Sequence, residues 1–174
     1  MNAVTAWSYS RLAQWETCPA QFAYKHIQKL KEEQSPAMAR GHAIHEAAAA
    51  FVKGEGPKPA EVVQFGRLID ELAAFPADIK VVEQQWGFTK NWRSTGWFGK
   101  DTWLRVILDA GVVYPDGTAD VVDFKTGKKY GTNADQMELF ALATMCRYPQ
   151  ISHVTTRLWY LDSGEEEIAE FEQH

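Results

Sequence analysis

The stretch that decides the fold is Val121-Val122-Asp123-Phe124-Lys125-Thr126-Gly127-Lys128, read together with Leu108-Asp109-Ala110 before it. Each of the two apolar runs leads to a carboxylate, and the turn-forming sequence Pro115-Asp116-Gly117 lies between them. This pattern is typical of a β-hairpin. A hairpin would set the two strands side by side and bring Asp109 and Asp123 close to one point.

Lys125 follows Asp123 by two residues, so both side chains would lie on one face of a strand. Carboxylate oxygens are the ligands that Mg²⁺ prefers, and an ammonium group beside them can orient an attacking water or stabilise charge on a phosphate. For either aspartate alone, a place at a strand end is explanation enough. The pair together with Lys125 favours a catalytic site for phosphodiester hydrolysis.

The length of 174 residues and a composition that is 45% hydrophobic and 24% charged predict one globular domain, residues 1–174. Cys18 and Cys146 give neither a disulfide framework nor a metal-binding spacing, which favours a reducing, intracellular setting. We find no signal peptide and no apolar run of about 18 residues. We therefore expect a cytoplasmic protein that has no membrane partner.

The net charge of −5 disfavours nucleic acid as a partner, but the charge is unevenly distributed. Residues 162–174 contain many acids and neither Lys nor Arg, whereas Lys and Arg outnumber Asp and Glu in residues 86–132. A locally basic surface is therefore compatible with an acidic chain. Ordinary solvated surface explains both segments equally well.

Aromatic residues gather in the more basic segment, where Lys90, Arg93 and Lys100 are interleaved with them. Such a mixture can stack bases and hold phosphates. Indoles that fill the core and cover sheet edges are the more common arrangement, and both interpretations stay open. The aromatic residues concerned are Trp86, Trp92, Trp97, Phe98 and Trp103.

Apolar periodicity and capping residues predict helices early in the chain and mainly strands later. Ser8 or Ser10 would cap the first helix, Pro19 would open the second, and Gly54 would end the third. The order of elements predicts an α/β fold with a mixed β-sheet flanked by α-helices. Beyond the short helix at residue 19, the predicted helices are one from Ser8 or Ser10 to about residue 16, then 37–52, 60–75 and 134–146. The predicted strands are 79–89, 103–113, 118–125, 154–161 and 166–171.

Other residues in these elements are candidates for a site. His45 follows His42 by three residues on one helix face, although a lone helical histidine is more often structural. Gly41 costs about 1 kcal/mol relative to Ala in a helix interior, which suggests that another backbone or a substrate comes close. Glu83, a charge in an apolar strand, would face either solvent or the site. Gln136 would reach toward the site or toward DNA, or be an ordinary first-turn residue.

Taken in order, these motifs resemble those of the PD-(D/E)XK nucleases, in the RecB-like branch that includes phage-type exonucleases and the CRISPR-adaptation exonucleases. The resemblance covers most of the chain, and its specificity comes from the ordered set rather than from any single motif. Residues 8–24 are similar to the N-terminal helical segment of the branch. The other motifs are Gly41-x-x-x-His45, Glu83, Leu108-Asp109, Val122-Asp123-Phe124-Lys125-Thr126-Gly127-Lys128 and Gln136-x-x-x-Phe140.

The resemblance implies a restriction-endonuclease-like core that binds one or two divalent cations, Mg²⁺ or Mn²⁺. It also implies that the lysine of the Asp-x-Lys signature is the catalytic lysine. The metal ligands it implies are His45, Asp109, Asp123 and the carbonyl of Phe124. The catalytic residues we expect are Lys125, Asp123, Asp109, Glu83 and Gln136.

Three features depart from the family pattern. Phe140 stands where Tyr is usual, so no hydroxyl is present there. Cys18 matches the first cysteine of the iron–sulfur members, but their C-terminal cysteine cluster is missing and Cys146 alone does not complete a four-thiolate site. We therefore expect no iron–sulfur cluster. The chain also ends soon after the last predicted strand, and we expect a stand-alone minimal nuclease.

The expected activity is that of a divalent-metal-dependent DNA nuclease acting in recombination, repair or degradation. An exonuclease is favoured over a sequence-specific endonuclease because the sequence contains no recognisable DNA-reading module. Such an enzyme could be phage-encoded and act in the host cell. One alternative is a nucleic-acid-binding subunit that keeps the fold but is non-catalytic or cuts only within a complex. Another is an unrelated α/β binding domain in which Asp123 and Lys125 form a surface pair.

Overall fold

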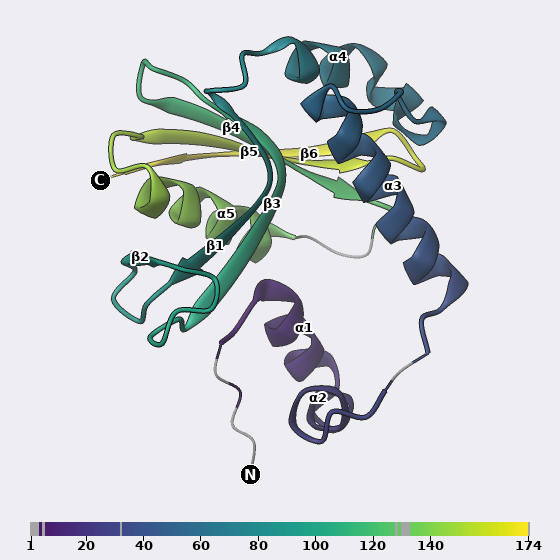
Figure 1. Ribbon diagram of the computed structural model, residues 1–174, viewed down its shortest axis with the longest axis vertical. Helices are drawn as coiled ribbons and strands as arrows, with labels where there is room; N and C mark the ends of the chain where they lie inside the picture. Colours follow the sequence, from purple (N-terminus) through teal and green to yellow (C-terminus); the bar gives the residue numbers. More distant parts are fainter. Residues whose placement is uncertain (1–3, 5, 32, 128, 130–132, 174) are drawn as a thin grey trace. The chain divides into compact units, whose positions relative to one another are not determined.

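The computed structural model describes every residue except 1–3, 5, 32, 128, 130–132 and 174. The described residues form a mixed sheet in the strand order β2-β1-β3-β4-β5-β6, together with helices (Figure 1). The predicted α/β class is confirmed. The helices are α1 Tyr9–Thr17, α2 Pro19–Phe22, a π-helix Ala23–Ile27, α3 Pro36–Lys53, a 3₁₀ helix Ala60–Phe65, α4 Gly66–Ala74 and α5 Ala134–Arg147. The strands are β1 Lys80–Phe88, β2 Ser94–Thr95, β3 Leu104–Val113, β4 Thr118–Lys125, β5 His153–Tyr160 and β6 Glu165–Glu172.

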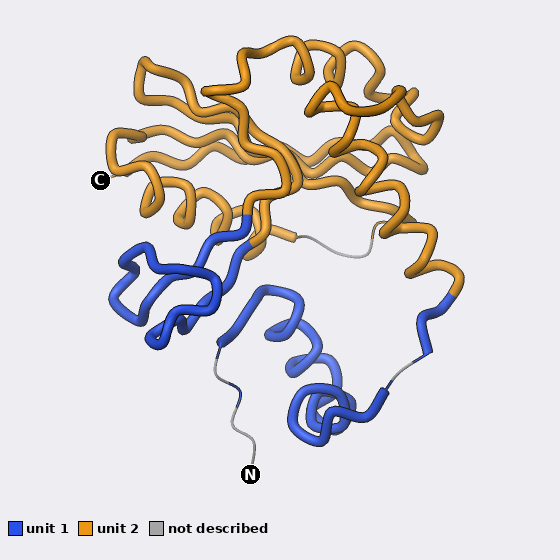
Figure 2. The backbone as a smooth tube through the Cα atoms, in the orientation of Figure 1, with its two compact units in different colours: residues 1–35, 85–106 blue, residues 36–84, 107–174 orange. Residues whose placement is uncertain are grey.

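The chain divides into two compact units, each drawn from two separate stretches of sequence (Figure 2). Unit 1 contains residues 1–35 and 85–106, and unit 2 contains residues 36–84 and 107–174. The single domain over residues 1–174 stays a prediction. No helix in the described part of the chain has the length and apolar character needed to cross a membrane.

In unit 1, short helices surround Phe22, whose side chain is almost fully buried. Ser8 caps α1 by accepting a backbone hydrogen bond of 3.4 Å, and Pro19 occupies the first turn of α2, as the sequence predicts. Trp7 stacks on the Phe22 ring with centroids 5.6 Å apart, and Trp15 meets it edge-on at 5.5 Å. These contacts give unit 1 an aromatic core of its own.

In unit 2, β3 and β4 form the hairpin that the opening sequence predicts. The strands are antiparallel, with Ala110 opposite Val122, and Gly117 adopts a φ of +92° in the connecting turn. Asp109 and Asp123 lie one residue beyond the Ala110–Val122 pair, each on its own strand. The hairpin register therefore carries both carboxylates to the same level of the sheet.

The chain leaves β4, forms α5 and returns as β5, which runs parallel to β4 with Lys125 opposite Tyr160. Because parallel strands end at the same edge of a sheet, the residues that follow β4 and β5 lie at that edge. β6 then pairs antiparallel with β5 and ends the sheet. Its glutamates put charge on an edge strand, which discourages pairing with a second chain.

Successive residues of β5 face opposite sides of the sheet, as the two-residue period of a strand requires. Trp159 joins the core cluster made with α3 and α4, together with Leu161 just after the strand. Leu158 and Tyr160 pack instead with Met137 of α5. Figure 1 shows α3 and α4 on one side of this part of the sheet and α5 on the other. Side chains from helices on both faces can therefore reach the end of β4.

Most predicted elements are confirmed within one or two residues, and the exceptions have local causes. The helix predicted over 60–75 is divided, because Phe65 leaves the helical region with φ −109° and ψ 23° before α4 begins. β2 has only two residues, too few for any periodicity to show in the sequence. In β1 the burial alternation fails around Glu83, whose φ of +47° interrupts the regular strand.

Candidate active site

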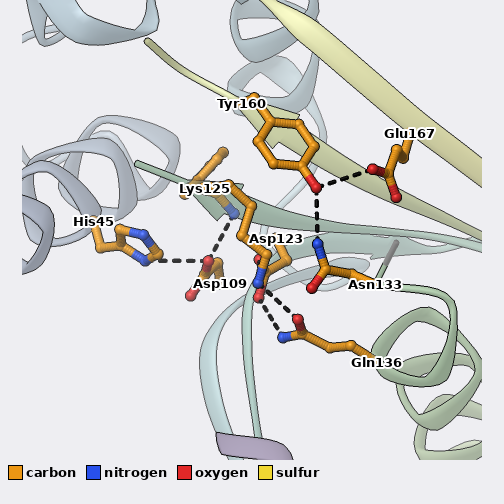
Figure 3. A network of polar contacts seen from close by, with 9 residues as sticks. His45, Asp109, Asp123, Lys125, Asn133, Gln136, Tyr160 and Glu167 are labelled. Atoms are coloured by element: carbon orange, nitrogen blue, oxygen red, sulfur yellow. Dashed lines mark hydrogen bonds and ion pairs between the residues drawn. The ribbon is translucent and has the colours of Figure 1, made fainter. Parts of the chain in front are cut away.

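Four of the candidate residues meet at the end of β4 (Figure 3). Asp109 comes from β3, Asp123 and Lys125 from β4, and His45 from α3. The Nδ1 atom of His45 lies 3.2 Å from Oδ2 of Asp109, and Nζ of Lys125 lies 2.7 Å from Oδ2 of Asp123. The structure therefore places two acid–base pairs at the end of the hairpin. The Asp123 pair is completed by Lys125 of β4 itself, and the Asp109 pair by His45 of α3.

Gln136, in the first turn of α5, connects two members of this group. Its Nε2 donates a hydrogen bond of 3.3 Å to Oδ1 of Asp123, and its Oε1 accepts one of 2.7 Å from Nζ of Lys125. An amide can donate and accept at once, which a carboxylate or an ammonium cannot do. Gln136 thus fixes the ammonium and the carboxylate relative to each other.

Asp123 is the buried charge of the site, with a relative exposure of 8%. Burial raises the pKa of Asp123 to about 6, the negative charge of Asp109 acts in the same direction, and Lys125 opposes both. Oδ2 of Asp123 lies within ion-pair distance of Lys125 but, among the described residues, accepts no hydrogen bond of normal geometry. This buried oxygen would gain from further positive charge.

Asp109 uses one oxygen for two contacts. Its Oδ2 accepts a hydrogen bond of 2.8 Å from the backbone N–H of Phe124 and lies next to the His45 ring. Burial lowers the pKa of His45, but the hydrogen bond to Asp109 and the carboxylate charge outweigh it, so the pKa of His45 is raised overall. The His45 ring also meets the Phe124 ring edge-on, with centroids 6.0 Å apart.

Among the described residues, no three His, Cys, Asp or Glu side chains are already arranged to hold a metal ion. Oδ2 of Asp109 lies against His45 and Oδ2 of Asp123 lies against Lys125. The residues nevertheless fit a divalent cation. Carboxylate oxygens with an imidazole are donors that Mg²⁺ and Mn²⁺ accept. A cation would also give the buried Oδ2 atom of Asp123 the partner that its missing hydrogen bond to the described residues leaves open. The ligand set with the Phe124 carbonyl stays a prediction.

Glu83 lies apart from this group among the described residues of unit 2. Its carboxylate pairs with Lys53 at the end of α3, with 3.4 Å between Oε2 and Nζ, and its side chain is 40% exposed. No contact within the described residues joins it to Asp109, Asp123 or Lys125. Of the two orientations considered from the sequence, the structure has the one toward solvent. A catalytic role for Glu83 stays a prediction.

Two residues that the sequence analysis did not single out hold the backbone next to the site. Asp162 accepts a hydrogen bond of 2.6 Å from the N–H of Gly127 and pairs through both oxygens with Arg40 of α3, at 2.6 and 3.0 Å. The Arg40 hydrogen bond, then the Gly127 N–H, keeps the pKa of Asp162 below its usual value. The sequence could have indicated Asp162 as a neighbour of the site, because it is a carboxylate just after β5 and β5 ends at the same edge of the sheet as β4.

A second polar network lies beside the site on the α5 face (Figure 3). The Tyr160 hydroxyl accepts a hydrogen bond of 2.8 Å from Asn133 and donates one of 3.0 Å to Glu167, which also pairs with Lys129 at 2.8 Å. Burial, followed by the hydrogen bond to Glu167, raises the pKa of Tyr160. The network ties β6 to the residue that precedes α5, and so supports the position of Gln136.

Gly41 of α3 is required by a close approach to the residue after β4. A Cβ atom at Gly41 would lie 2.8 Å from Oγ1 of Thr126, and the next nearest atom, the Thr126 Cβ, would be at 4.0 Å. The sequence suggested a neighbouring backbone or substrate at this position, and the neighbour is a side-chain hydroxyl. The missing Cβ lets the helix that carries His45 lie against the end of β4.

We expect a double-mutant cycle at Gly41 and Thr126 to reveal this contact. Gly41→Ala should be neutral or destabilising when Thr126 is present, because the gain of about 1 kcal/mol in helix propensity is cancelled by the clash. With Thr126→Ala the same change should stabilise the protein by about 1 kcal/mol. Urea unfolding measures both values. Ala43→Gly, an exposed change in the same helix, is the control and should cost the same in both backgrounds. Equal effects of Gly41→Ala in both backgrounds would contradict the contact.

Comparison with known proteins addresses the family of the chain. The family model described as "PD-(D/E)XK nuclease superfamily" matches residues 6–101, which include His45 and Glu83 and end before Asp109. No curated protein matches the chain. A solved structure described as "Crystal structure of SSO0001" is 11% identical, with 99% of this chain and 69% of that chain covered and a TM-score of 0.44, values at which the likeness carries no argument. On the family match, which spans more than half of its length, the chain belongs to the PD-(D/E)XK nuclease superfamily.

Proposed function

We propose that the protein is a divalent-metal-dependent deoxyribonuclease of the RecB-like branch that degrades DNA from its ends. The observation that supports it most is the contact network in which Asp109, Asp123 and Lys125 meet at the end of one hairpin. The superfamily implies a nucleic-acid substrate and typically uses divalent metal ions. The preference for ends, and a role in recombination, repair or degradation, rest on the order of the sequence motifs.

In this proposal each polar residue of the site has a distinct task. Asp109 and Asp123 hold the cation, with His45 and the Phe124 carbonyl as further ligands. A bound Mg²⁺ or Mn²⁺ would supply positive charge against the phosphate and the attacking water. Lys125 orients that water or stabilises charge on the phosphate. Gln136 is a positioning residue, because its amide holds Lys125 and Asp123 together.

One observation favours the alternative of a subunit that cuts only within a complex or not at all. Oδ2 of each carboxylate already lies against an internal partner, the Lys125 ammonium or the His45 imidazole, so a metal would have to displace these contacts. DNA binding by the purified chain without cleavage under any metal would support that alternative.

The proposal predicts metal-dependent degradation that requires DNA ends. The purified chain is incubated with end-labelled linear DNA and with closed circular DNA of the same sequence, in Mg²⁺, Mn²⁺ or chelator. Linear DNA should be degraded in the presence of metal, and closed circles should persist. Chelator should stop the reaction, because the carboxylate pair acts only through the cation that it binds. Full cleavage in chelator would overturn the metal mechanism. Equal cleavage rates on linear and closed circular DNA would show that the protein is an endonuclease and not an exonuclease.

Substitutions should separate metal binding from chemistry. Asp109→Ala and Asp123→Ala each remove a negative ligand, so Mn²⁺ binding measured by calorimetry should weaken and cleavage should collapse. Lys125→Ala removes a positive charge beside the cation, so Mn²⁺ should bind as well as before or more tightly. Its single-turnover cleavage should still fall by about 10²–10⁴-fold.

Arg67→Ala is the matched control, since Arg67 is a cation on α4 whose side chain is 85% exposed. It should leave metal binding and cleavage unchanged. A Lys125→Ala protein that cuts at the wild-type rate would show that the proposed site is misassigned.

A further inference from the structure

The aromatic and basic segment of unit 1, residues 89–105, is here called the basic tip. Part of its aromatic content fills the interior, which was the more common arrangement. Trp92 packs against Phe88 and Trp103, with ring centroids 6.5 and 6.2 Å apart, and Trp86 is buried. Trp97 and Phe98 do not belong to this packing, and their position needs another explanation.

Phe98 stands out because its side chain is 85% exposed on a turn that is firmly held. The N–H of Gly99 donates to the carbonyl of Gly96 at 2.9 Å, and the Thr102 hydroxyl donates to the same carbonyl at 2.8 Å. The turn is thus closed by its own hydrogen bonds. An exposed ring on a fixed turn is held outward without any apolar partner to cover it.

Arg105 of β3 supports both outer aromatic rings. Its Nε donates a hydrogen bond of 2.9 Å to the carbonyl of Trp97, and its guanidinium lies 5.2 Å from the ring centroids of Trp97 and Phe98. These are cation–π distances. Phe98 remains largely exposed despite this contact, so a face of the ring is free for a flat ligand.

Positive charge surrounds a groove in the same segment. Lys90, Arg93 and Lys100 line it together with Trp103, and the one acidic residue beside them is Asp101. None of the three cationic side chains forms an ion pair with a described residue. In a chain with a net charge of −5, a group of unpaired cations is a local exception that suits an anionic partner.

We propose that the basic tip binds unpaired nucleotides of a DNA strand, with a base stacked on Phe98 and the phosphates held by Lys90, Arg93 and Lys100. Stacking on an aromatic ring requires a base face that is free, and in a duplex both faces of an internal base are already covered. The presence of an exposed ring in the same segment as a cationic groove therefore favours a single strand over a duplex. The inference rests on the proposed function only for the identity of the substrate as DNA.

Binding of fluorescent oligonucleotides to the full-length protein in chelator, where no cleavage is expected, tests this inference. A thymidine oligomer and a blunt duplex of equal length are the two probes, and anisotropy gives each dissociation constant. Phe98→Ala and Phe98→Leu should weaken binding of the single strand by about 5- to 150-fold, the range for loss of one stacked base. Phe98→Trp should retain binding, and the duplex should be little affected by any of the three.

The charged residues are tested through salt. Lys90→Ala combined with Lys100→Ala should weaken single-strand binding and lower the slope of log K against log salt by about 1.4, since each phosphate contact contributes about 0.7. Arg67→Ala, an exposed cation on another element, should change neither value. Thermal melting of each variant verifies the fold, which an 85% exposed side chain should not affect.

The outcomes separate this inference from the proposed nuclease activity. If single-strand binding is unchanged in all variants of the basic tip, the tip does not bind DNA as proposed, whether or not the wild type cleaves DNA. Weakening by the lysine variants with no effect of Phe98→Ala also overturns it, because any polyanion would then suffice. If binding depends on the basic tip but the protein never cleaves DNA with Mg²⁺ or Mn²⁺, strand binding by the tip is supported and the proposed nuclease activity is contradicted.

Discussion

The site depends on one constraint, the presence of two carboxylates on adjacent strands with one of them buried. The hairpin register leaves Asp109 and Asp123 at the same level, and burial together with the neighbouring charge raises the pKa of Asp123 to about 6. Such a pair requires compensating positive charge close by. Lys125 provides it 2.7 Å from Asp123, and the His45 ring lies 3.2 Å from Asp109. The two partners come from different elements of unit 2.

The packing of helices in unit 2 brings the partner residues to the two carboxylates. Gly41 allows α3 to approach Thr126, which brings His45 to Asp109 from one face of the sheet. The crossover from β4 to β5 places α5 on the opposite face, where Gln136 reaches Asp123 and Lys125. Both carboxylates therefore have partners from elements outside their own hairpin, contributed from the two faces of the sheet.

The sequence predicted the elements that a short-range pattern encodes. The hairpin followed from two apolar runs and the Pro-Asp-Gly turn, and the register of that hairpin brought Asp109 to Asp123. The pairing of Arg40 with Asp162, 122 residues apart, depends on how α3 packs beside β5, and no local pattern contains that information. Glu83 shows the same limit in a strand, because a positive φ interrupts the alternation of β1 and the sequence left its orientation open between solvent and the site.

We propose that the Asp109 and Asp123 carboxylates together hold a divalent cation. This is tested by a crystal structure with Mn²⁺, recorded at a wavelength where manganese scatters anomalously. We expect an anomalous peak within about 2.0–2.6 Å of an oxygen from each carboxylate, the range found for hard divalent cations, and we expect Lys125 to have moved away from Oδ2 of Asp123. Saturating Mn²⁺ that leaves both acid–base pairs as they are, with no peak between the carboxylates, would contradict it.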